Sequence, residues 1–374
     1  SDPLNQQLFQ QSFYQATSSQ RIIEGSVNGT FGIASTSVHY RRQEQIHSYD
    51  SSTVYGNTPR VAASLAPQML FGVPLYASVN SEYAYVPNQR IFRGEVTDDR
   101  TLQKWDLAPT LRLPLSRLTY LSVNTSASYR STYYSRSDDS TGRPLDAGLL
   151  RQYLSLGSQF IGPVLTKIWD TPNSRSTERM KHVIEPTFLV NYTTEFDNQA
   201  NVPKLPDQTD FVVGGTTTLT YGLNNRFFYR GRATSESPGR ALTREFVTIG
   251  LQQTYYSKPE SSAYDGTYIS RRANTDLSPI QLTARVAPTA RLDANARLEY
   301  DVNGNGLTSL TVGSSVNGAT TSANVSYSRS RYSSAAELNS LLYGSTSTRL
   351  MQGRVTGTYS FSWDLARSYV ASQT

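Results

Sequence analysis

The chain has 374 residues, with 35 Lys and Arg against 29 Asp and Glu, and it contains no Cys. Only 17% of the residues are charged, whereas 48 Ser and 40 Thr enrich the uncharged polar class; an average soluble domain is about 25% charged. These numbers exclude disulfide frameworks, thiolate metal sites and Cys nucleophiles, and no apolar run approaches the roughly 18 residues of a transmembrane helix.

Strict alternation of apolar and polar residues is the dominant pattern along the chain. Between Leu292 and Asp301, Leu, Ala and Tyr alternate with Asp, Asn, Arg and Glu, so an extended strand there has one apolar and one polar face. Similar segments predict about fifteen antiparallel strands. They cover residues 22–31, 33–44, 59–68, 74–86, 104–114, 118–134, 152–169, 181–194, 214–227, 243–257, 278–288, 290–301, 306–317, 319–332 and 349–363.

The length of these strands and the composition of their polar face favour a membrane barrel over a soluble sandwich. Soluble strands cluster near five or six residues, whereas crossing a bilayer at a tilt takes about 9–11. The polar face carries Ser, Thr, Asn, Gln and Arg, which is typical of a barrel lumen. The predicted fold class is all-β, an antiparallel transmembrane β-barrel segment that forms one outer-membrane domain over residues 1–374. Nine residues are expected to point outward: Leu75, Val79, Leu111, Val123, Phe188, Leu219, Ile249, Leu298 and Tyr359.

Short turns and long polar loops fall on opposite ends of the predicted strands, as in outer-membrane barrels. The long loops are residues 45–58, 87–103, 135–151, 195–213, 258–277 and 333–348. The odd strand count, and a further strand expected to begin within 368–374, indicate an unclosed segment of a larger barrel. Strands 22–31 and 349–363 are therefore expected not to pair with each other.

Motifs for chemistry are weak in this sequence. The segment Asp301–Gly306 matches the opening of a calcium-binding EF-hand loop, but the required twelfth-position acid is Val312, so a hairpin turn is predicted. The only histidines are His39, His47 and His182, and no nucleophile motif accompanies them. We therefore predict no catalytic residues, no metal site and no cofactor. No basic run or basic helix indicates nucleic acid.

Charged and amide residues on the polar faces are the candidate site residues. Alternation places them in the lumen, where they can contact a polar cargo or a plug, or pair across neighbouring strands. Glu185 and Arg226 are predicted to lie on adjacent strands at similar depth, within ion-pair reach. The full candidate set is Glu185, Asn224, Arg226, Arg285, Asp293, Arg297 and Glu299.

Two segments resemble the lipopolysaccharide-assembly outer-membrane family LptD, also known as the organic solvent tolerance family. The first is Lys-His-Val-Ile-Glu-Pro at 181–186, followed by an Asp- and Asn-rich loop, and the second is the Asn-Asn-Arg strand at 219–226. The residues that match the family signature are His182, Glu185, Pro186, Asn225 and Arg226.

The resemblance implies a function that the pattern alone does not provide. It implies a barrel in the outer membrane of Gram-negative cells that assembles lipopolysaccharide (LPS) into the outer leaflet. The implied partners are LPS, the plug lipoprotein LptE, and periplasmic LPS-bridge proteins that act through an N-terminal jelly roll. From the resemblance, we expect that jelly roll and the seam strands to be missing from this sequence, which also contains no Cys to match the family's cysteines. The alternative is a porin or another outer-membrane channel, and a soluble β-sandwich is a third possibility.

Overall fold

The computed structural model describes residues 20–48, 50–174, 177–205, 212–232, 243–269, 274–304, 306–331, 338–351 and 354–373. These residues form long antiparallel strands that divide into two compact units. The first unit contains residues 1–113, 126–156 and 193–215, and the second contains 114–125, 157–192 and 216–374. Among the described residues, no helix is long and apolar enough to cross a membrane.

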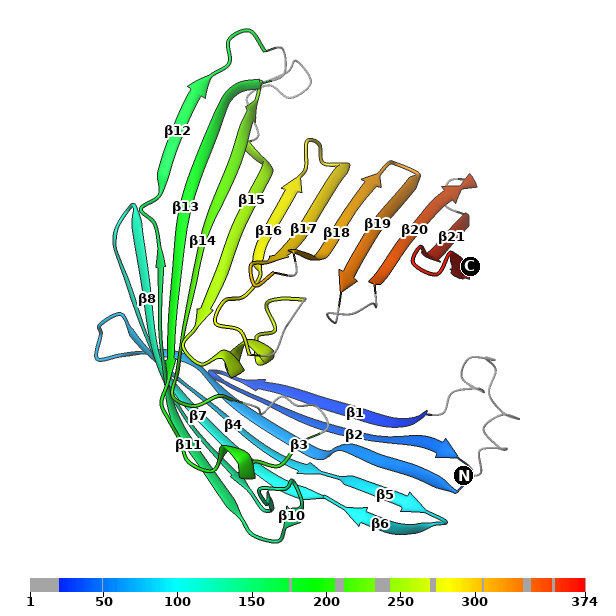
Figure 1. Ribbon diagram of the computed structural model, residues 1–374. Helices are drawn as coiled ribbons and strands as arrows, with labels where there is room; N and C mark the ends of the chain where they lie inside the picture. Colours follow the sequence, from blue (N-terminus) through cyan, green and yellow to red (C-terminus); the bar gives the residue numbers. More distant parts are fainter. Residues whose placement is uncertain are drawn as a thin grey trace. The chain divides into compact units, whose positions relative to one another are not determined.

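The first unit is built on strands joined by antiparallel hairpins. β1 pairs with β2, β2 with β3, β3 with β4, and β4 with β7, while the β5–β6 hairpin continues from the edge of β3. Figure 1 shows these strands in blue and cyan. Their bounds are β1 Gln20–Phe31, β2 Ala34–Ser48, β3 Ser51–Leu70, β4 Leu75–Val86, β5 Asn88–Phe92, β6 Glu95–Asp99, β7 Leu102–Leu118, β8 Leu121–Tyr134, β9 Ser137–Asp138, β10 Pro144–Leu145, β11 Leu149–Ile161 and the 3-10 helix η1 Gln199–Asn201, with the ends of β7, β8 and β11 reaching into the second unit.

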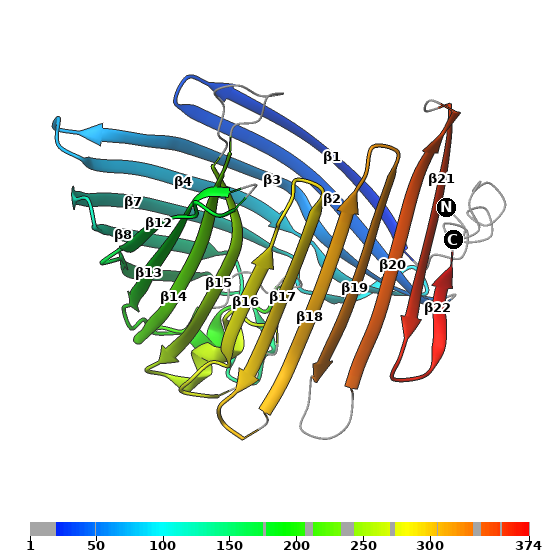
Figure 2. The same ribbon diagram turned by 90° about the horizontal axis from the view of Figure 1, so that it is seen from above.

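The second unit is a run of antiparallel neighbours in chain order, which Figure 2 shows side by side from β14 to β22. Its elements are β12 Leu165–Asp170, β13 Thr177–Thr193, β14 Thr216–Gly231, β15 Thr243–Tyr256, η2 Pro259–Tyr264, β16 Ile280–Val286, β17 Leu292–Asp301, β18 Gly306–Asn317, β19 Thr321–Arg331, β20 Leu338–Leu350, β21 Val355–Asp364 and β22 Tyr369–Gln373. Residues 287–291 and 318–320, with 351 and 354, lie at one end of these strands, here called the turn end. Residues 257–269 and 274–279 lie at the other end, here called the loop end.

The predicted all-β fold is confirmed, but the sheet formed by the described residues has 20 strands rather than about fifteen. The expected loop at 333–348 was wrong, because residues 338–350 form β20, which pairs with both β19 and β21. Its Ser- and Thr-rich sequence resembles a loop in composition, yet such residues suit the polar side of a barrel strand. The other additional strands are the β5–β6 hairpin, β22, and the division of predicted strand 152–169 into β11 and β12.

The division between β11 and β12 has a local cause at Gly162-Pro163. Gly162 has a φ of 115°, and a Cβ added there would lie 2.2 Å from the backbone oxygen of Tyr120. Only glycine fits this conformation and this close approach. Pro163 has no backbone N–H, so the ladder is interrupted at that residue.

The two outermost strands of the sheet each have one ladder. β1 pairs with β2, and β22, which begins within the expected segment 368–374, pairs with β21. In the described residues no ladder joins β1 to β21 or β22, so the sheet is not closed, as predicted.

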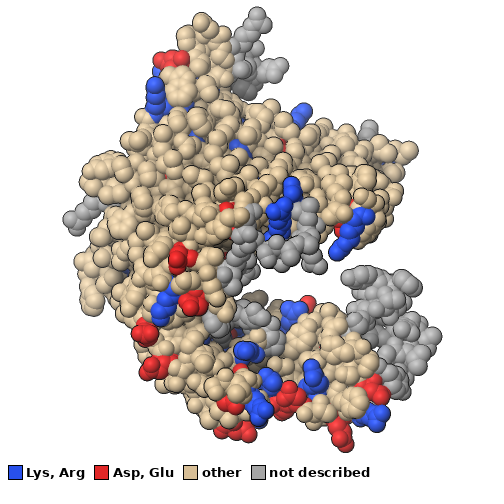
Figure 3. Space-filling model, viewed as in Figure 1, with Lys and Arg blue, Asp and Glu red and all other residues tan. Residues whose placement is uncertain are grey.

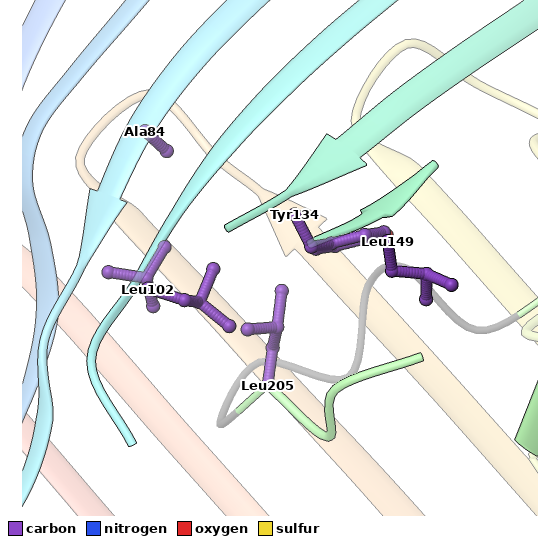
Figure 4. Close-up of a cluster of buried hydrophobic side chains, with 6 residues drawn as sticks. Ala84, Leu102, Tyr134, Leu149 and Leu205 are labelled. Carbon is purple, nitrogen blue, oxygen red and sulfur yellow. The ribbon is translucent and has the colours of Figure 1, made fainter. Parts of the chain in front are cut away.

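A small hydrophobic core lies in the first unit, at the ends of β4, β7, β8 and β11 (Figure 4). Leu205, from the segment after η1, belongs to the same cluster as Leu102 and Tyr134. Most apolar side chains elsewhere are exposed or half-buried. Strands of this length with so little core need a second apolar phase to cover them.

Candidate functional site on the polar face

The register across β16 and β17 separates an apolar face from a polar face. Leu282 lies opposite Leu298, and the adjacent Gln281 lies opposite Glu299. Because successive residues of a strand point to opposite sides of the sheet, the leucines and the polar pair mark its two faces.

The nine residues expected to point outward are not enclosed in a protein core. Leu111, Phe188, Ile249 and Tyr359 are between 38% and 44% exposed, and the other five are half-buried. In the part of the chain that the structure describes, no second layer covers the apolar face at these positions. The face is therefore available to lipid.

The Arg226 guanidinium of β14 lies between two carboxylates on the polar face. Its Nη2 is 2.6 Å from Glu245 Oε2, and its Nη1 is 3.6 Å from Glu185 Oε1. The guanidinium also lies over the Phe228 ring, 5.0 Å from the centroid. The predicted proximity of Glu185 and Arg226 is confirmed. All three charged side chains are between 23% and 37% exposed, so water weakens each attraction.

Glu245, the closer partner of Arg226, is absent from the predicted set. Simple alternation from Val247 and Ile249 places Glu245 on the apolar face. The ladder between β14 and β15 shifts by one residue between Phe227 and Phe228. Such a bulge reverses the facing of the residues beyond it, and it brings Glu245 to Arg226.

Asn224 lies on the polar face in the space left by a glycine. It is opposite Gly250 of β15. A Cβ at Gly250 would lie 2.9 Å from Asn224 Oδ1 and 2.7 Å from Thr283 Oγ1. The absence of a side chain at Gly250 therefore allows both polar groups to approach the sheet.

The other residues of the family signature lie on the apolar face. His182 Nε2 is 3.1 Å from Asn225 Oδ1, and the imidazole stacks on Phe227 with a centroid distance of 4.1 Å. Asn225 is opposite Ile249, and Pro186 follows Glu185 and so takes the opposite face. The signature thus divides between the faces, with Glu185 and Arg226 on the polar one.

Arg285 and Asp293 form a pair near the turn end of β16 and β17. Arg285 Nη2 is 2.6 Å from Asp293 Oδ2. Arg285 is 67% exposed and Asp293 33% exposed. Both side chains remain accessible to a large partner.

Arg297 and Glu299 anchor the connection between β15 and β16, of which the structure describes residues 257–269 and 274–279; these described residues are here called the 257–279 segment. Arg297 Nη2 is 2.6 Å from Glu299 Oε1 and donates to the Thr267 backbone oxygen at 2.5 Å. Glu299 also accepts a hydrogen bond of 2.9 Å from the Ile269 N–H, and its side chain is fully buried. These two candidate residues therefore contact the chain's own loop.

Three further hydrogen bonds hold the same segment against the loop end. Tyr268 bonds the Thr254 hydroxyl at 2.9 Å, Tyr256 donates to Asp265 at 2.6 Å, and Ser261 of η2 bonds Thr216 at 2.9 Å. Burial raises the pKa of the Tyr268 phenol. The segment therefore packs on the polar face of β14 to β17 as a hydrogen-bonded insert.

The first unit has a charged network of its own on the polar face. Glu82 accepts from Arg60 at 2.6 Å and lies 3.6 Å from Lys104 Nζ, which is 8% exposed. Asp106 binds Arg130 at 2.8 Å. None of these residues was a predicted site residue, although alternation in strand 74–86 already assigns Glu82 to the polar face.

A shallow groove of about 440 Å³ adjoins this network. Its hydroxyls include Ser35 and Ser64, whose oxygens are 2.6 Å apart. The small side chains of β1 to β4 create the hollow, and two carboxylates border it. Its lining includes Asn28, Ser37, Ser64, Asn80, Glu82 and Asp106.

Metal-ligand geometry is not found in the described ranges, where no group of three or more His, Asp or Glu side chains is placed to hold an ion. Hydroxyl, amide and paired charged groups dominate the polar face. Such a surface binds polar molecules by hydrogen bonds and local charge.

A family model described as LptD, LPS transport system D, matches residues 1–368. No curated protein sequence matches the chain. Similar solved structures include the siderophore receptor PirA from Pseudomonas aeruginosa (12% identity, TM-score 0.48) and the FrpB iron transporter from Neisseria meningitidis (12%, 0.36). The match to PirA covers 92% of this chain and 67% of the PirA chain, and the match to FrpB covers 91% of this chain and 59% of the FrpB chain. Similarity at this level does not indicate function.

Proposed function

Because the chain belongs to the LptD family, we propose that its polar face guides the sugar-phosphate part of LPS on the way to the outer leaflet. The family is one of LPS-transport proteins, and the chain is an outer-membrane β-barrel protein of that system. The family match over residues 1–368 carries the proposal.

The chemistry of the polar face supports this role. A phosphorylated glycolipid needs hydrogen-bonding groups along its path, and Ser, Thr and Asn provide them without the strong binding that would prevent release. Arg226 can exchange its ion-pair contact with Glu185, at 3.6 Å, for a phosphate oxygen while Glu245 holds the guanidinium in place. The site therefore permits transient contacts with an anionic cargo.

The plug lipoprotein LptE is the proposed protein partner on the same face. Arg285 is its best contact candidate in the predicted set, because its side chain is 67% exposed, and Asp293 is its ion-pair partner. Glu299 is fully buried under the 257–279 segment and is not available to a plug while that segment is packed. Delivery by periplasmic bridge proteins is proposed from family membership alone.

Charge reversal at Arg226 in the full-length protein tests the proposal. Arg226→Glu places three carboxylates together and should repel phosphorylated cargo, so surface LPS should fall and sensitivity to large antibiotics should rise. Arg291→Glu, at an exposed residue of the turn 287–291, is the matched control and should behave as wild type. The amount of folded barrel is measured by heat-modifiable migration in electrophoresis. Wild-type LPS export by folded Arg226→Glu would contradict the proposed function.

A further inference from the structure

Three nitrogen-bearing side chains, Lys167, His182 and Asn225, lie together on the apolar face of the second unit. Lys167 of β12 is directly opposite His182 of β13. His182 is bonded to Asn225 of β14 at 3.1 Å and is stacked on Phe227. Polar groups on a lipid-facing surface need a hydrogen-bonding partner, so this cluster requires a specific explanation.

The cluster has hydrogen-bond donors for which the described residues provide no acceptor. Since an amide oxygen can only accept, Nε2 of His182 donates to Asn225 Oδ1, and the Asn225 amide nitrogen stays available. Lys167 is exposed. Within the described ranges, neither the Lys167 ammonium nor the Asn225 amide nitrogen has a hydrogen-bond or ion-pair partner. An anion with several acceptor oxygens could accept hydrogen bonds from both groups.

The residue pairing between neighbouring strands places the cluster at the turn end of the second unit. Phe227, which stacks on His182, lies opposite Val247, and Val247 lies opposite Val286. Val286 is the last residue of β16 before the turn at 287–291. The cluster is therefore level with the end of the neighbouring hairpin.

Beyond that level, β12, β13 and β14 continue past the turn between β16 and β17 and become charged (Figure 1). Asp170 pairs with Arg179 at 2.8 Å, and Glu178 pairs with Arg230 at 3.4 Å. Charged atoms gather beside the tip of β12 at the upper left of Figure 3, above a surface with few charges. By alternation Glu178 shares the face of Met180 and His182, whereas Asp170 and Arg179 lie on the polar face. Both faces are therefore charged at this end of the strands, which marks the membrane–water boundary.

The opposite boundary agrees with this placement. Ile184 and Phe188 follow His182 on the same face of β13, and Tyr192 lies ten residues beyond it. A tilted strand crosses a bilayer in about 9–11 residues. The cluster and Tyr192 are therefore one bilayer thickness apart.

We propose that Lys167, His182 and Asn225 bind the phosphate of an anionic phospholipid headgroup in the leaflet at the turn end. The Lys167 ammonium neutralises the phosphate, and the Asn225 amide donates to one of its oxygens. Ile184 and Phe188 contact the acyl chains. The proposal uses the membrane location of the chain and is independent of LPS transport.

Trp169 provides the reporter for a direct test. It lies two residues from Lys167 on the same face, opposite Met180. The chain has three Trp residues, so the background Trp105→Phe/Trp363→Phe leaves one fluorophore. This protein is reconstituted in phosphatidylethanolamine vesicles that contain equal mole fractions of either brominated phosphatidylglycerol or brominated phosphatidylethanolamine.

The expected result is stronger quenching of Trp169 by the brominated anionic lipid. A cation near a membrane surface attracts anionic lipid by about 1 kcal/mol, so Lys167→Gln should reduce the local enrichment about fivefold. Asn225→Ala should also reduce it. Lys181→Gln is the matched control, because Lys181 adjoins His182 but lies on the opposite face, across from Ile168. Equal quenching by the two lipids, or equal effects of Lys167→Gln and Lys181→Gln, would overturn the site.

Discussion

Arg226 has two carboxylate partners of unequal quality. The 2.6 Å contact with Glu245 is close enough for a charge-assisted hydrogen bond, and the 3.6 Å contact with Glu185 is not. Glu245→Gln should therefore destabilise the barrel more than Glu185→Gln. The partial exposure of all three groups limits the larger effect to about 1 kcal/mol.

Two double-mutant cycles, one for Arg226 with Glu185 and one for Arg226 with Glu245, compare the two contacts. The readout is unfolding in urea from lipid vesicles. The coupling free energy should be larger for Arg226 with Glu245. A larger coupling with Glu185 would show that the bulge at Phe227 does not set the pairing.

In the first unit, Asp106 is the carboxylate whose removal we expect to lower the free energy of unfolding substantially. It accepts from Arg130 Nε at 2.8 Å and from Thr132 Oγ1 at 2.5 Å, and only 10% of its side chain is exposed. Asp106→Ala leaves Arg130 partly enclosed without this carboxylate, so we predict a loss of about 3 kcal/mol of unfolding free energy.

The temperature at which the folded electrophoretic band disappears should fall for Asp106→Ala and fall less for Asp106→Asn, which keeps an acceptor. Glu95→Ala, on the exposed hairpin β5–β6, serves as the control. An Asp106→Ala protein as stable as this control would refute the assigned role.

Alternation predicted the facing of single residues well where the ladder is regular. Glu185 and Arg226 were found together by this rule and by strand order. Glu245 was missed because a bulge has no simple signal in one sequence. The burial of Glu299 was also missed, since alternation gives the face of a residue and not what covers that face.

At the scale of elements, the 257–279 segment depends on Glu299. Glu299→Ala removes the acceptor of the Ile269 N–H and the partner of Arg297. The segment should then detach, and protease should cleave within it at least tenfold faster, which corresponds to about 1.4 kcal/mol. Asp293→Ala, on the same strand but near the turn end, is the control. Unchanged cleavage in Glu299→Ala would show that the other hydrogen bonds suffice.

Alkaline pH should release the same segment. Burial raises the folded-state pKa of Tyr268 above its ordinary value of 10.0, so the detached segment loses the phenolic proton at lower pH than the packed one. Below pH 10 the phenol is neutral in both forms and stability is fully present; as pH rises from 10 toward the folded-state pKa, packing weakens. Cleavage by an alkaline protease should increase over this range and increase less in Tyr268→Phe. A dependence that Tyr268→Phe leaves intact would assign the effect to another group.

Element boundaries followed from the sequence where apolar residues alternate with polar ones and turns contain Gly or Asn. β20 was missed because Ser and Thr dominate its sequence, so its composition was interpreted as a loop. The break at Gly162-Pro163 carries a readable signal, since proline interrupts a ladder. The packing of 257–279 depends on contacts between distant strands, which one sequence does not reveal.

At the scale of the whole molecule, the sheet needs lipid on one face and water on the other. The long strands, the exposed apolar face and the scarce core all follow from this division. The signature around His182 and Arg226 was sufficient to identify the family from the sequence. No pattern in the sequence indicated which polar residues remain accessible. The packing of the loop over Glu299, for example, is visible only in the structure.

Neighbouring residues of β14 provide the most direct test of the central claim that LPS passes along the polar face. Asn224 lies on the polar face, and Leu223 lies on the apolar face and is 37% exposed. A photo-crosslinking amino acid is placed at either position of the full-length protein in growing cells, and the products are probed for LPS. We predict LPS adducts at position 224 and none at 223. Adducts at 223 alone, or none at 224 in a folded and active protein, would contradict the account.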